Sequence, residues 1–319
     1  MQPILVSVIV PVLNMDAYLD RFLSEFRLQT FFQFTELVVD LNRPSAEALL
    51  IVEKYKRLYK KQLVVHTQSE IDPIAISMNR AILKSKGRYI AIWNADDLRT
   101  PDSLEQQYKF LSSKGEYVAV GGPYVIVKKF GDAIGRLVDD SGVAESELLR
   151  GMFLGPFVMF DSKALSEVGL FDEQLKSGAD FDLAIRLARN GRVGFVSDVL
   201  GYYLDAGLGA STRPNSLQAI ERSVIELRYG IFDKFDHEFI PKITKYDVAG
   251  LYFNGKRNLV QDCFHDYHDY YEKMTDLYWR RTTNFSISRQ ASFAVSGIAD
   301  FVRRGYSHLK NLVRSEDHR

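Results

Sequence analysis

The first hundred residues alternate between short apolar runs and longer segments with helical periodicity, and this alternation is the strongest constraint on the fold. The apolar runs of strand length lie at residues 6–11, 36–40, 63–66 and 89–93. Between them, apolar residues recur at helical spacing in segments that begin near residues 16, 45 and 73. Parallel strands require such helical crossovers, so we predict an α/β fold with a mostly parallel central sheet and flanking helices.

The pattern loosens in the rest of the chain. Residues 101–114 predict a helix. Short apolar runs up to residue 203 predict further strands, interrupted by helices that start near Ser162 and Asp180. From Pro214 onwards the composition favours long helices without strands. We therefore predict an α/β domain over residues 1–212 and a helical C-terminal extension over residues 213–319.

Charge and cysteine content narrow the class of protein. Lys and Arg number 41 and Asp and Glu number 41, so the zero net charge gives no indication of nucleic-acid binding. The single cysteine, Cys263, excludes an internal disulfide framework and fits a reducing compartment. No stretch reaches the roughly 18 apolar residues of a membrane span, and the first residues lack a leader pattern. We expect a cytoplasmic protein, or one that contacts the inner face of a membrane only peripherally.

The apolar run at residues 89–93 leads directly into Asn94, Asp96 and Asp97. Ligands of open α/β sheets bind beyond the carboxyl ends of the strands. Amide and carboxylate oxygens are groups that hold Mg²⁺ or Mn²⁺. The spacing therefore indicates a metal or phosphate site, although the same residues also suit an ordinary solvated loop or the charged start of the next helix.

Several separate motifs follow one another in a specific order. They are Pro11-Val12-Leu13-Asn14, then Asp40, then Asn79 ahead of Lys86-Gly87-Arg88-Tyr89-Ile90, then Asn94-Ala95-Asp96-Asp97, and finally Asp180-Phe181-Asp182-Leu183 with Arg186-Leu187. In this order they resemble the motifs of the family 2 glycosyltransferases over roughly residues 4–212. The resemblance implies the GT-A fold, a Rossmann-like architecture of nucleotide-diphospho-sugar transferases.

The resemblance also implies roles for single residues. Asp40 matches the acid that contacts the nucleoside of the donor, Asp96 matches the metal-binding acid, and Asp180 matches the general base near the acceptor. Asn94 and Asp97 would assist Asp96 in binding the metal. The residues implied to bind the nucleotide are Pro11, Val12, Asn14, Asp40, Asn79, Asn94 and Asp96.

The implied reaction is inverting transfer of a sugar from a UDP-, GDP- or dTDP-sugar to a glycan or lipid-linked acceptor in polysaccharide or cell-surface glycan synthesis, with Mn²⁺ or Mg²⁺ as cofactor. Elementary chemistry agrees with these roles. The departing diphosphate gains negative charge that a divalent cation at Asp96 would neutralise. The attacking hydroxyl must lose a proton, which a carboxylate such as Asp180 can accept.

The sequence departs from the family pattern at several positions. Leu41, Asn94 and Ala179 stand where the family often has acids, and Met78 stands where an Arg is expected. Because of these losses, a non-catalytic binding or scaffold protein with the GT-A fold remains an alternative. A sugar nucleotidyltransferase is a weaker alternative, because residues 11–16 lack the glycine and lysine that cradle a triphosphate.

Some of these acids also have structural interpretations. Asp40 and Asp180 could each cap the helix that follows them. Asp182 is expected to be structural, pairing with Arg186 at i,i+4 on the helix surface.

The C-terminal third offers weaker signals. Residues 207–212 suit either a lid over the donor phosphates or a linker between domains. Cys263, His265 and His268 lack the second pair of a zinc site, so we expect a solvated or partner-facing surface there. Residues 279–319 form a basic amphipathic pattern that suits peripheral membrane contact, packing on the catalytic domain, or packing on a second subunit in a homo-oligomer.

Overall fold

The computed structural model describes residues 2–131, 134–150, 154–205, 217–231, 242 and 245–260. The chain divides into two compact units, one formed by Met1–Gln218 with Gly250–His265 and the other by Ala219–Ala249 with Asp266–Arg319. The predictions for residues 207–212, for Cys263, His265 and His268, and for residues 279–319 lie outside the described residues.

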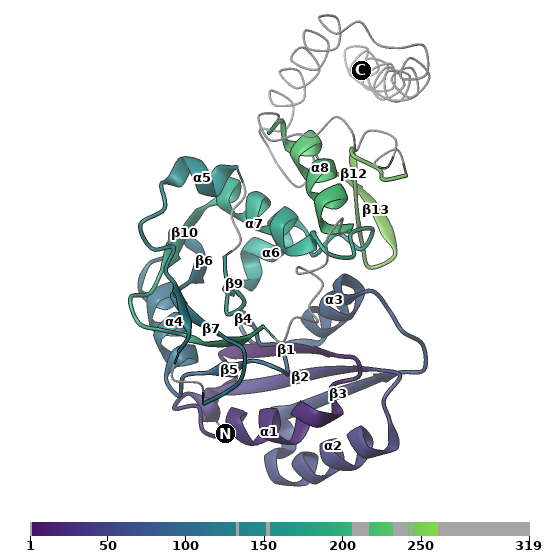
Figure 1. The fold of residues 1–319 in the computed structure, drawn as a ribbon, viewed down its shortest axis with the longest axis vertical. Helices are drawn as coiled ribbons and strands as arrows, with labels where there is room; N and C mark the ends of the chain where they lie inside the picture. The colour runs from purple at the N-terminus through teal and green to yellow at the C-terminus, as the bar shows by residue number, and fades with distance from the viewer. Residues whose placement is uncertain are drawn as a thin grey trace, which may run out of the picture. The chain divides into compact units, whose positions relative to one another are not determined.

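A mixed seven-stranded sheet forms the centre of the first unit, in the order β10-β6-β9-β4-β1-β2-β3 (Figure 1). The bounds of its strands are β1 Val6–Val12, β2 Thr35–Asn42, β3 Leu63–Gln68, β4 Tyr89–Ile92, β6 Tyr117–Gly121, β9 Met159–Asp161 and β10 Arg192–Phe195. Strand β9 runs antiparallel to both β4 and β6, and the other neighbouring pairs are parallel. The predicted mostly parallel α/β sheet is therefore confirmed.

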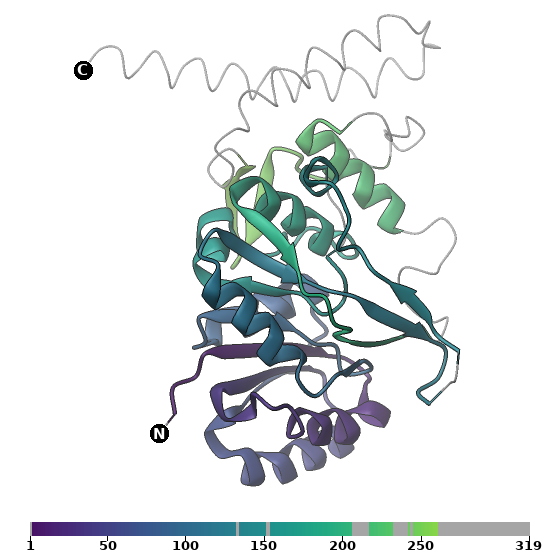
Figure 2. The ribbon, with the colours of Figure 1, turned by 90° about the vertical axis from the view of Figure 1, so that its left-hand side faces the viewer.

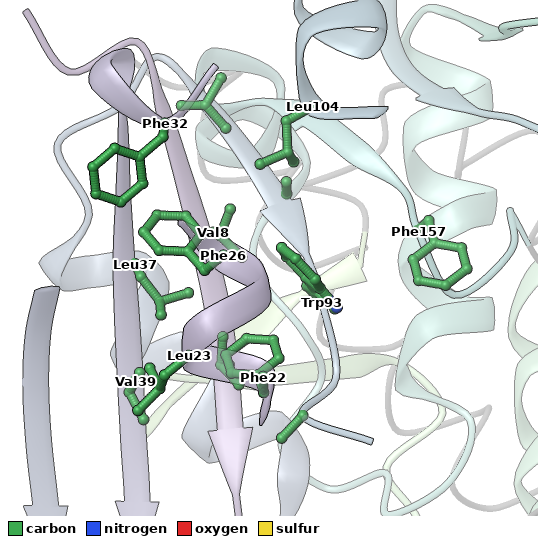
Figure 3. Close-up of a cluster of buried hydrophobic side chains, with 14 of the residues drawn as sticks. Val8, Phe22, Leu23, Phe26, Phe32, Leu37, Val39, Trp93, Leu104 and Phe157 are labelled. Carbon is green, nitrogen blue, oxygen red and sulfur yellow. The ribbon is translucent and has the colours of Figure 1, made fainter. Parts of the chain in front are cut away.

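Helices cover both faces of this sheet. Helices α1 (Asp16–Phe26) and α2 (Ala46–Tyr59) lie on one face, and α3 (Ile74–Lys84) lies on the other (Figure 1). The apolar residues of α1 recur at helical spacing, and those that are buried are Leu19, Phe22, Leu23 and Phe26. Figure 3 shows this face of α1 packed toward Trp93, whose ring centroid lies 5.0 Å from that of Phe22. The helical crossovers thus bury the apolar stripes that the sequence shows.

The chain also forms a second, smaller sheet with the strand order β5-β11-β7-β8. Its strands are β5 Leu98–Arg99, β11 Gly201–Leu204, β7 Tyr124–Val127 and β8 Arg136–Val138. The remaining helices of the described residues are α4 Ser103–Ser113, α5 Glu145–Leu149, α6 Ser162–Val168, α7 Ala179–Asn190 and α8 Leu217–Tyr229, with short 3₁₀ turns at Phe32–Phe34 and Lys60–Gln62. Figure 2 shows the same elements turned by 90° from the view of Figure 1. Among the described helices, none is long and apolar enough to cross a membrane.

A hairpin near the end of the described chain differs from the expectation of helices without strands after Pro214. Strands β12 (Gly250–Phe253) and β13 (Lys256–Leu259) pair antiparallel and belong to the first unit. Asn254 and Gly255 form its turn with φ angles of 53° and 66°. Positive φ at both central residues is the geometry of a type I′ turn, for which Asn-Gly is the preferred dipeptide. The local signal was present, but the helical composition around it obscured it.

Gly87 shows why one motif residue has to be glycine. It precedes β4 and lies against β1, where a Cβ atom would sit 2.5 Å from the backbone nitrogen of Ser7. Its N–H donates to the Ser7 hydroxyl at 2.8 Å, and that hydroxyl donates to the buried carboxylate of Glu36 at 2.7 Å. A side chain at position 87 would therefore push β4 away from β1, the strand pair that carries the candidate site at its far end.

Candidate active site

A hollow of about 100 Å³ opens at the carboxyl ends of β1 and β2. It is lined by Val12, Asn14, Asp16, Leu41, Asn42, Arg43, Pro44, Ser45 and Ala48. Asn14 and Arg43 both have positive φ, at 55° and 45°, so the chain turns sharply after each strand. Val12 and Asn14, which the resemblance assigns to nucleotide binding, both line this hollow, and Pro11 lies in β1 opposite Asp40. Their contact with a nucleotide stays a prediction.

The Asp40 carboxylate is enclosed by protein groups. Its side chain is fully buried, and Arg80 donates to both of its oxygens, Nε to Oδ1 at 2.8 Å and Nη2 to Oδ2 at 2.7 Å. The Ser77 hydroxyl donates to Oδ2 at 2.6 Å, and the Asn42 amide donates to the same oxygen at 3.2 Å. Asp40 does not line the hollow, whereas Asn42 does, so the structure connects Asp40 to the hollow through Asn42.

The structure also decides the capping interpretation of Asp40. The N-cap of α2 is Ser45, whose Oγ accepts the N–H of Ala48 at 3.0 Å. Asp40 lies within β2 and pairs with Arg80 of α3. The alternative that Asp40 caps the following helix is therefore wrong, and its assignment to the nucleoside stays a prediction.

The acids after β4 differ sharply from each other. Asp97 is fully buried, and its carboxylate accepts the N–H of Leu204 at 3.0 Å and the side-chain amide of Asn94 at 3.2 Å. Burial raises the pKa of Asp97 to about 7, and the neighbouring charge of Asp96 adds to the shift. Asp97 therefore ties the loop to β11, where it holds a backbone N–H in place.

Asp96 is partly exposed. Within the described part of the chain, no hydrogen bond from another residue reaches its carboxylate. Partial burial raises the pKa of Asp96 from its ordinary value, and the charge of Arg21 opposes this shift. Of the two neighbouring acids, Asp96 is the one whose oxygens are open to a ligand.

Two arginines that the sequence did not single out support this loop. Arg21 of α1 donates from Nη2 to the backbone oxygen of Asp96 at 3.0 Å, and its guanidinium lies 4.3 Å from the ring centroid of Phe130. Arg99 is buried beneath the loop, where its Nη2 donates to the oxygen of Ile92 at 2.7 Å and its Nη1 donates to Gln107 at 2.9 Å. Burial lowers the pKa of Arg99 to about 9. Their roles depend on tertiary contacts, so no local pattern would have identified them.

Asn79 lies away from the hollow in this structure. It is buried in α3, where its side-chain amide donates to the oxygen of Phe171 at 2.8 Å and accepts the N–H of the same residue at 2.9 Å. The amide also donates to Glu173 at 2.9 Å. The observed partners of Asn79 therefore belong to the connection between α6 and α7.

Asp180 is an exposed residue in the first turn of α7, and its Oδ1 accepts the N–H of Phe181 at 2.8 Å. The N-cap position of this helix is Gly178 rather than Asp180. Asp182 pairs with Arg186 at 2.8 Å, as the i,i+4 spacing predicts, but both side chains are fully buried instead of lying on the helix surface. On α7, therefore, Asp182 is buried and Asp180 is exposed.

A cation at this site would have few protein ligands. Considering only the residues that the structure describes, no group of three or more His, Cys, Asp or Glu side chains could hold a metal ion. In the loop after β4, the candidate ligand oxygens are those of the Asp96 carboxylate and the Asn94 side chain. The Asn94 amide nitrogen donates a hydrogen bond to Asp97, which leaves the Asn94 oxygen for a cation. Mg²⁺ is commonly bound by one or two carboxylates and completes its shell with waters and substrate phosphates. This sparse donor set fits a cation that arrives with a diphosphate.

Comparisons with known proteins identify the family and the fold of the chain. The family model for glycosyl transferase family 2 matches residues 7–164, about half of the chain. An uncharacterized glycosyltransferase of Rickettsia bellii is 28% identical over 194 residues, or 58% of this chain and 27% of that protein. One from Rickettsia typhi is 27% identical over 255 residues, or 76% of this chain and 74% of that protein. The chain spans about a third or less of the length of the first curated relatives that it matches.

A solved structure shows the same architecture. S. aureus TarS in complex with UDP-GlcNAc aligns with a TM-score of 0.57 at 18% identity, covering 76% of this chain and 71% of that one. Similarity at this level of identity shows the fold, which is GT-A. The ordered motifs, the sheet that places Asp96 and the hollow at its carboxyl edge, and the family match lead to one conclusion. The chain belongs to glycosyl transferase family 2 and has the GT-A fold.

Proposed function

We propose that this chain is an inverting glycosyltransferase that moves a sugar from a nucleotide-sugar donor to a hydroxyl group of a glycan or lipid-linked acceptor. In this proposal Asp96 binds a divalent cation and Asp180 is the general base. Family membership supports the reaction class.

The observation that carries the proposal is the contrast between Asp96 and Asp97. Asp97 is fully buried, and its two carboxylate oxygens accept hydrogen bonds from the Leu204 N–H and the Asn94 amide. Asp96 is partly exposed at the carboxyl edge of the sheet, where ligands of α/β folds bind. In a metal site, the carboxylate that binds the cation must be accessible, as Asp96 is. The hydrogen bonds of its neighbour Asp97 would hold the loop that carries it in place.

Asp96 and Asn94 would hold Mg²⁺ or Mn²⁺ through their oxygens. When bound, such a cation supplies positive charge to the departing diphosphate. Arg21 donates to the backbone oxygen of Asp96, and Arg99 donates to the backbone oxygen of Ile92, the last residue of β4, so two arginines hold the backbone within and just before the loop. This preorganisation keeps the Asp96 carboxylate in position without using its oxygens.

Asp180 is proposed to take the proton of the acceptor hydroxyl. Its carboxylate is exposed, and the N–H of Phe181 orients one of its oxygens. A carboxylate that accepts a proton on the side opposite the departing diphosphate gives in-line displacement with inversion. The proposed base and the proposed metal ligand belong to different elements, α7 and the loop after β4, which is compatible with their separate roles.

The hollow beside β1 and β2 is proposed to take the nucleoside. Val12, Leu41 and Ala48 supply apolar surface, and Asn14 and Asn42 supply amides that can bind a base or ribose. UDP, GDP and dTDP all remain candidates for the donor nucleotide, and UDP-GlcNAc, which TarS binds, is a suitable first donor to test. Peripheral membrane contact through residues 279–319 and a homo-oligomer remain predictions.

The test compares Asp180→Asn with the exposed control Asp102→Asn. A panel of UDP-, GDP- and dTDP-sugars is supplied with Mn²⁺ and pooled oligosaccharide acceptors, and release of nucleoside diphosphate is measured. We expect Asp180→Asn to lose about 10²–10⁴-fold in turnover while its nucleotide affinity stays within about twofold, and Asp102→Asn to match the wild type. Turnover that survives Asp180→Asn removes the base role. A wild-type protein that neither binds nucleotides nor releases them supports the scaffold alternative.

A further inference from the structure

The connection between α6 and α7 is held by hydrogen bonds to three separate parts of the first unit, two of which contribute side chains and one of which contributes backbone groups. These parts are α7 itself, α3, and the β12–β13 hairpin. The connection leads into the first turn of α7, which carries Asp180. It lies beyond the family match at residues 7–164, and the hairpin lies beyond it as well.

Arg186 of α7 holds the start of the connection. Its Nη1 donates to the oxygen of Gly169 at 2.9 Å, and its Nη2 donates to the oxygen of Leu170 at 2.7 Å. Asp182 fixes the guanidinium through Nε at 3.0 Å and Nη2 at 2.8 Å. Because Arg186 and Asp182 are fully buried, these bonds are shielded from water and are correspondingly costly to break.

Asn79 of α3 holds the middle of the connection. Its side chain takes both backbone groups of Phe171, accepting the N–H at 2.9 Å and donating to the oxygen at 2.8 Å. This two-point contact pairs the peptide groups of a residue that is itself buried. Asn79 thereby links the helix that packs on β1 and β2 to the segment that leads into α7.

The hairpin holds the end of the connection. Glu173 donates its backbone N–H to the oxygen of Tyr252 at 2.6 Å. Its carboxylate accepts the N–H of Asn254 at 2.8 Å and the N–H of Gly255 at 3.3 Å, in addition to the Asn79 amide. Asp172 accepts the N–H of Tyr252 at 3.0 Å. Glu173 is the residue at which helix α3, the connection and the hairpin turn meet.

We propose that Glu173, with Asn79 and the β12–β13 hairpin, is a positioning device for the first turn of α7 and therefore for Asp180. The inference rests on the proposed function, because it takes Asp180 as the general base. It also gives Asn79 a role other than nucleotide contact. A base displaced by about 1 Å can lose up to about two orders of magnitude in rate, so holding the connection at several points has a direct catalytic consequence.

The test uses Glu173 rather than Asn79. Truncating Asn79 would leave the buried N–H and carbonyl of Phe171 unpaired, at a cost that can unfold the protein. The Glu173 carboxylate is partly exposed, and the hairpin bonds that it accepts lie at the surface. Glu173→Ala should therefore fold. The matched control is Glu167→Ala in α6, which removes an exposed carboxylate that lies 3.8 Å from Lys163 and accepts the Asn190 amide at 3.1 Å at the opposite end of α7 from Asp180.

The full chain is assayed for kcat, for donor KM and for amide hydrogen exchange. We expect Glu173→Ala to lower kcat about tenfold with donor KM within about twofold, and to speed exchange at Asn254 and Gly255. Glu173→Gln keeps one acceptor oxygen for Asn79 and Asn254, so it should recover most of kcat. Glu167→Ala should match the wild type in all three measurements.

The outcomes separate this inference from the proposed function. A Glu173→Ala protein with wild-type kcat overturns the positioning role, and so does a loss of kcat that Glu173→Gln does not relieve. If Asp180→Asn abolishes turnover while Glu173→Ala does nothing, only the positioning inference fails. If Asp180→Asn keeps its turnover, the base assignment itself fails, and any effect of Glu173 must have another cause.

Discussion

Arg80 forms a bidentate pair with Asp40, donating from Nε to Oδ1 at 2.8 Å and from Nη2 to Oδ2 at 2.7 Å. Its third nitrogen, Nη1, binds Asp72 at 2.8 Å. The bond to Asp40 is the main cause that raises the pKa of Arg80. The pair joins β2 to α3, and Asp40 precedes in sequence the residues after β2 that line the hollow. The acid that the family pattern assigns to the donor is thus engaged within the protein.

Asp40→Asn tests whether this pair is structural. The carboxylate is fully buried, so removing its charge leaves Arg80 and Ser77 with a poorer partner. We expect the free energy of unfolding in urea to fall by about 3 kcal/mol, the scale for breaking a buried ion pair. Asp20→Asn is the control, because the Asp20 side chain is 55% exposed in its pair with Lys54 and should change stability by less than about 1 kcal/mol. Equal, small effects of both variants would contradict the structural role.

Arg186→Met tests whether the hydrogen bonds of Arg186 stabilise the connection between α6 and α7. The variant removes the partner of Asp182 and of the carbonyls of Gly169 and Leu170, all in a fully buried setting. We expect a loss of about 3–5 kcal/mol in unfolding free energy. Arg192→Met breaks an exposed pair with Glu116, in which both side chains are 59% exposed, and should cost less than about 1 kcal/mol. An Arg186→Met protein as stable as the Arg192→Met control would contradict the structural role of the buried Arg186 contacts.

His66 gives the protein a pH dependence of predictable sign. Burial lowers the pKa of His66 from its ordinary value, and Lys84 and Arg80 add to this shift while Asp40 opposes it. The unfolded chain therefore takes up the proton more readily, so the stabilisation is present above about pH 6.5 and is lost as the pH falls through that value toward the lower folded pKa. His66→Phe should remove this part of the slope in urea unfolding between about pH 7.5 and 5.5. Identical slopes for both proteins would contradict the prediction.

Much of the fold could be predicted from the sequence because it depends on local periodicity. The alternating strands and helices of the first hundred residues each show their own apolar pattern, and the central sheet follows from it. The β12–β13 hairpin was missed even though Asn254-Gly255 is a strong turn signal, because the surrounding composition is helical. Local signals that conflict with their surroundings are easily overlooked.

The candidate site was only partly predictable. The spacing of Asp182 and Arg186 predicted their pairing, but their burial depends on carbonyls that come from the preceding connection. The contacts of Asn79 with Phe171 and of Arg80 with Asp40 join residues far apart in sequence. The motifs therefore name candidate residues but do not indicate which distant residues these side chains contact in the fold.

Calorimetric titration with UDP, GDP and dTDP, each with and without Mn²⁺, tests the central claim most directly. The account predicts that one nucleotide binds the wild type, that Mn²⁺ strengthens this binding by about tenfold or more, and that Asp96→Asn removes the metal effect while Asp102→Asn retains it. Binding of equal strength with and without Mn²⁺ would remove Asp96 from its role as metal ligand. Failure of the wild-type protein to bind any of the three nucleotides would contradict the proposal that this chain is a nucleotide-sugar-dependent glycosyltransferase.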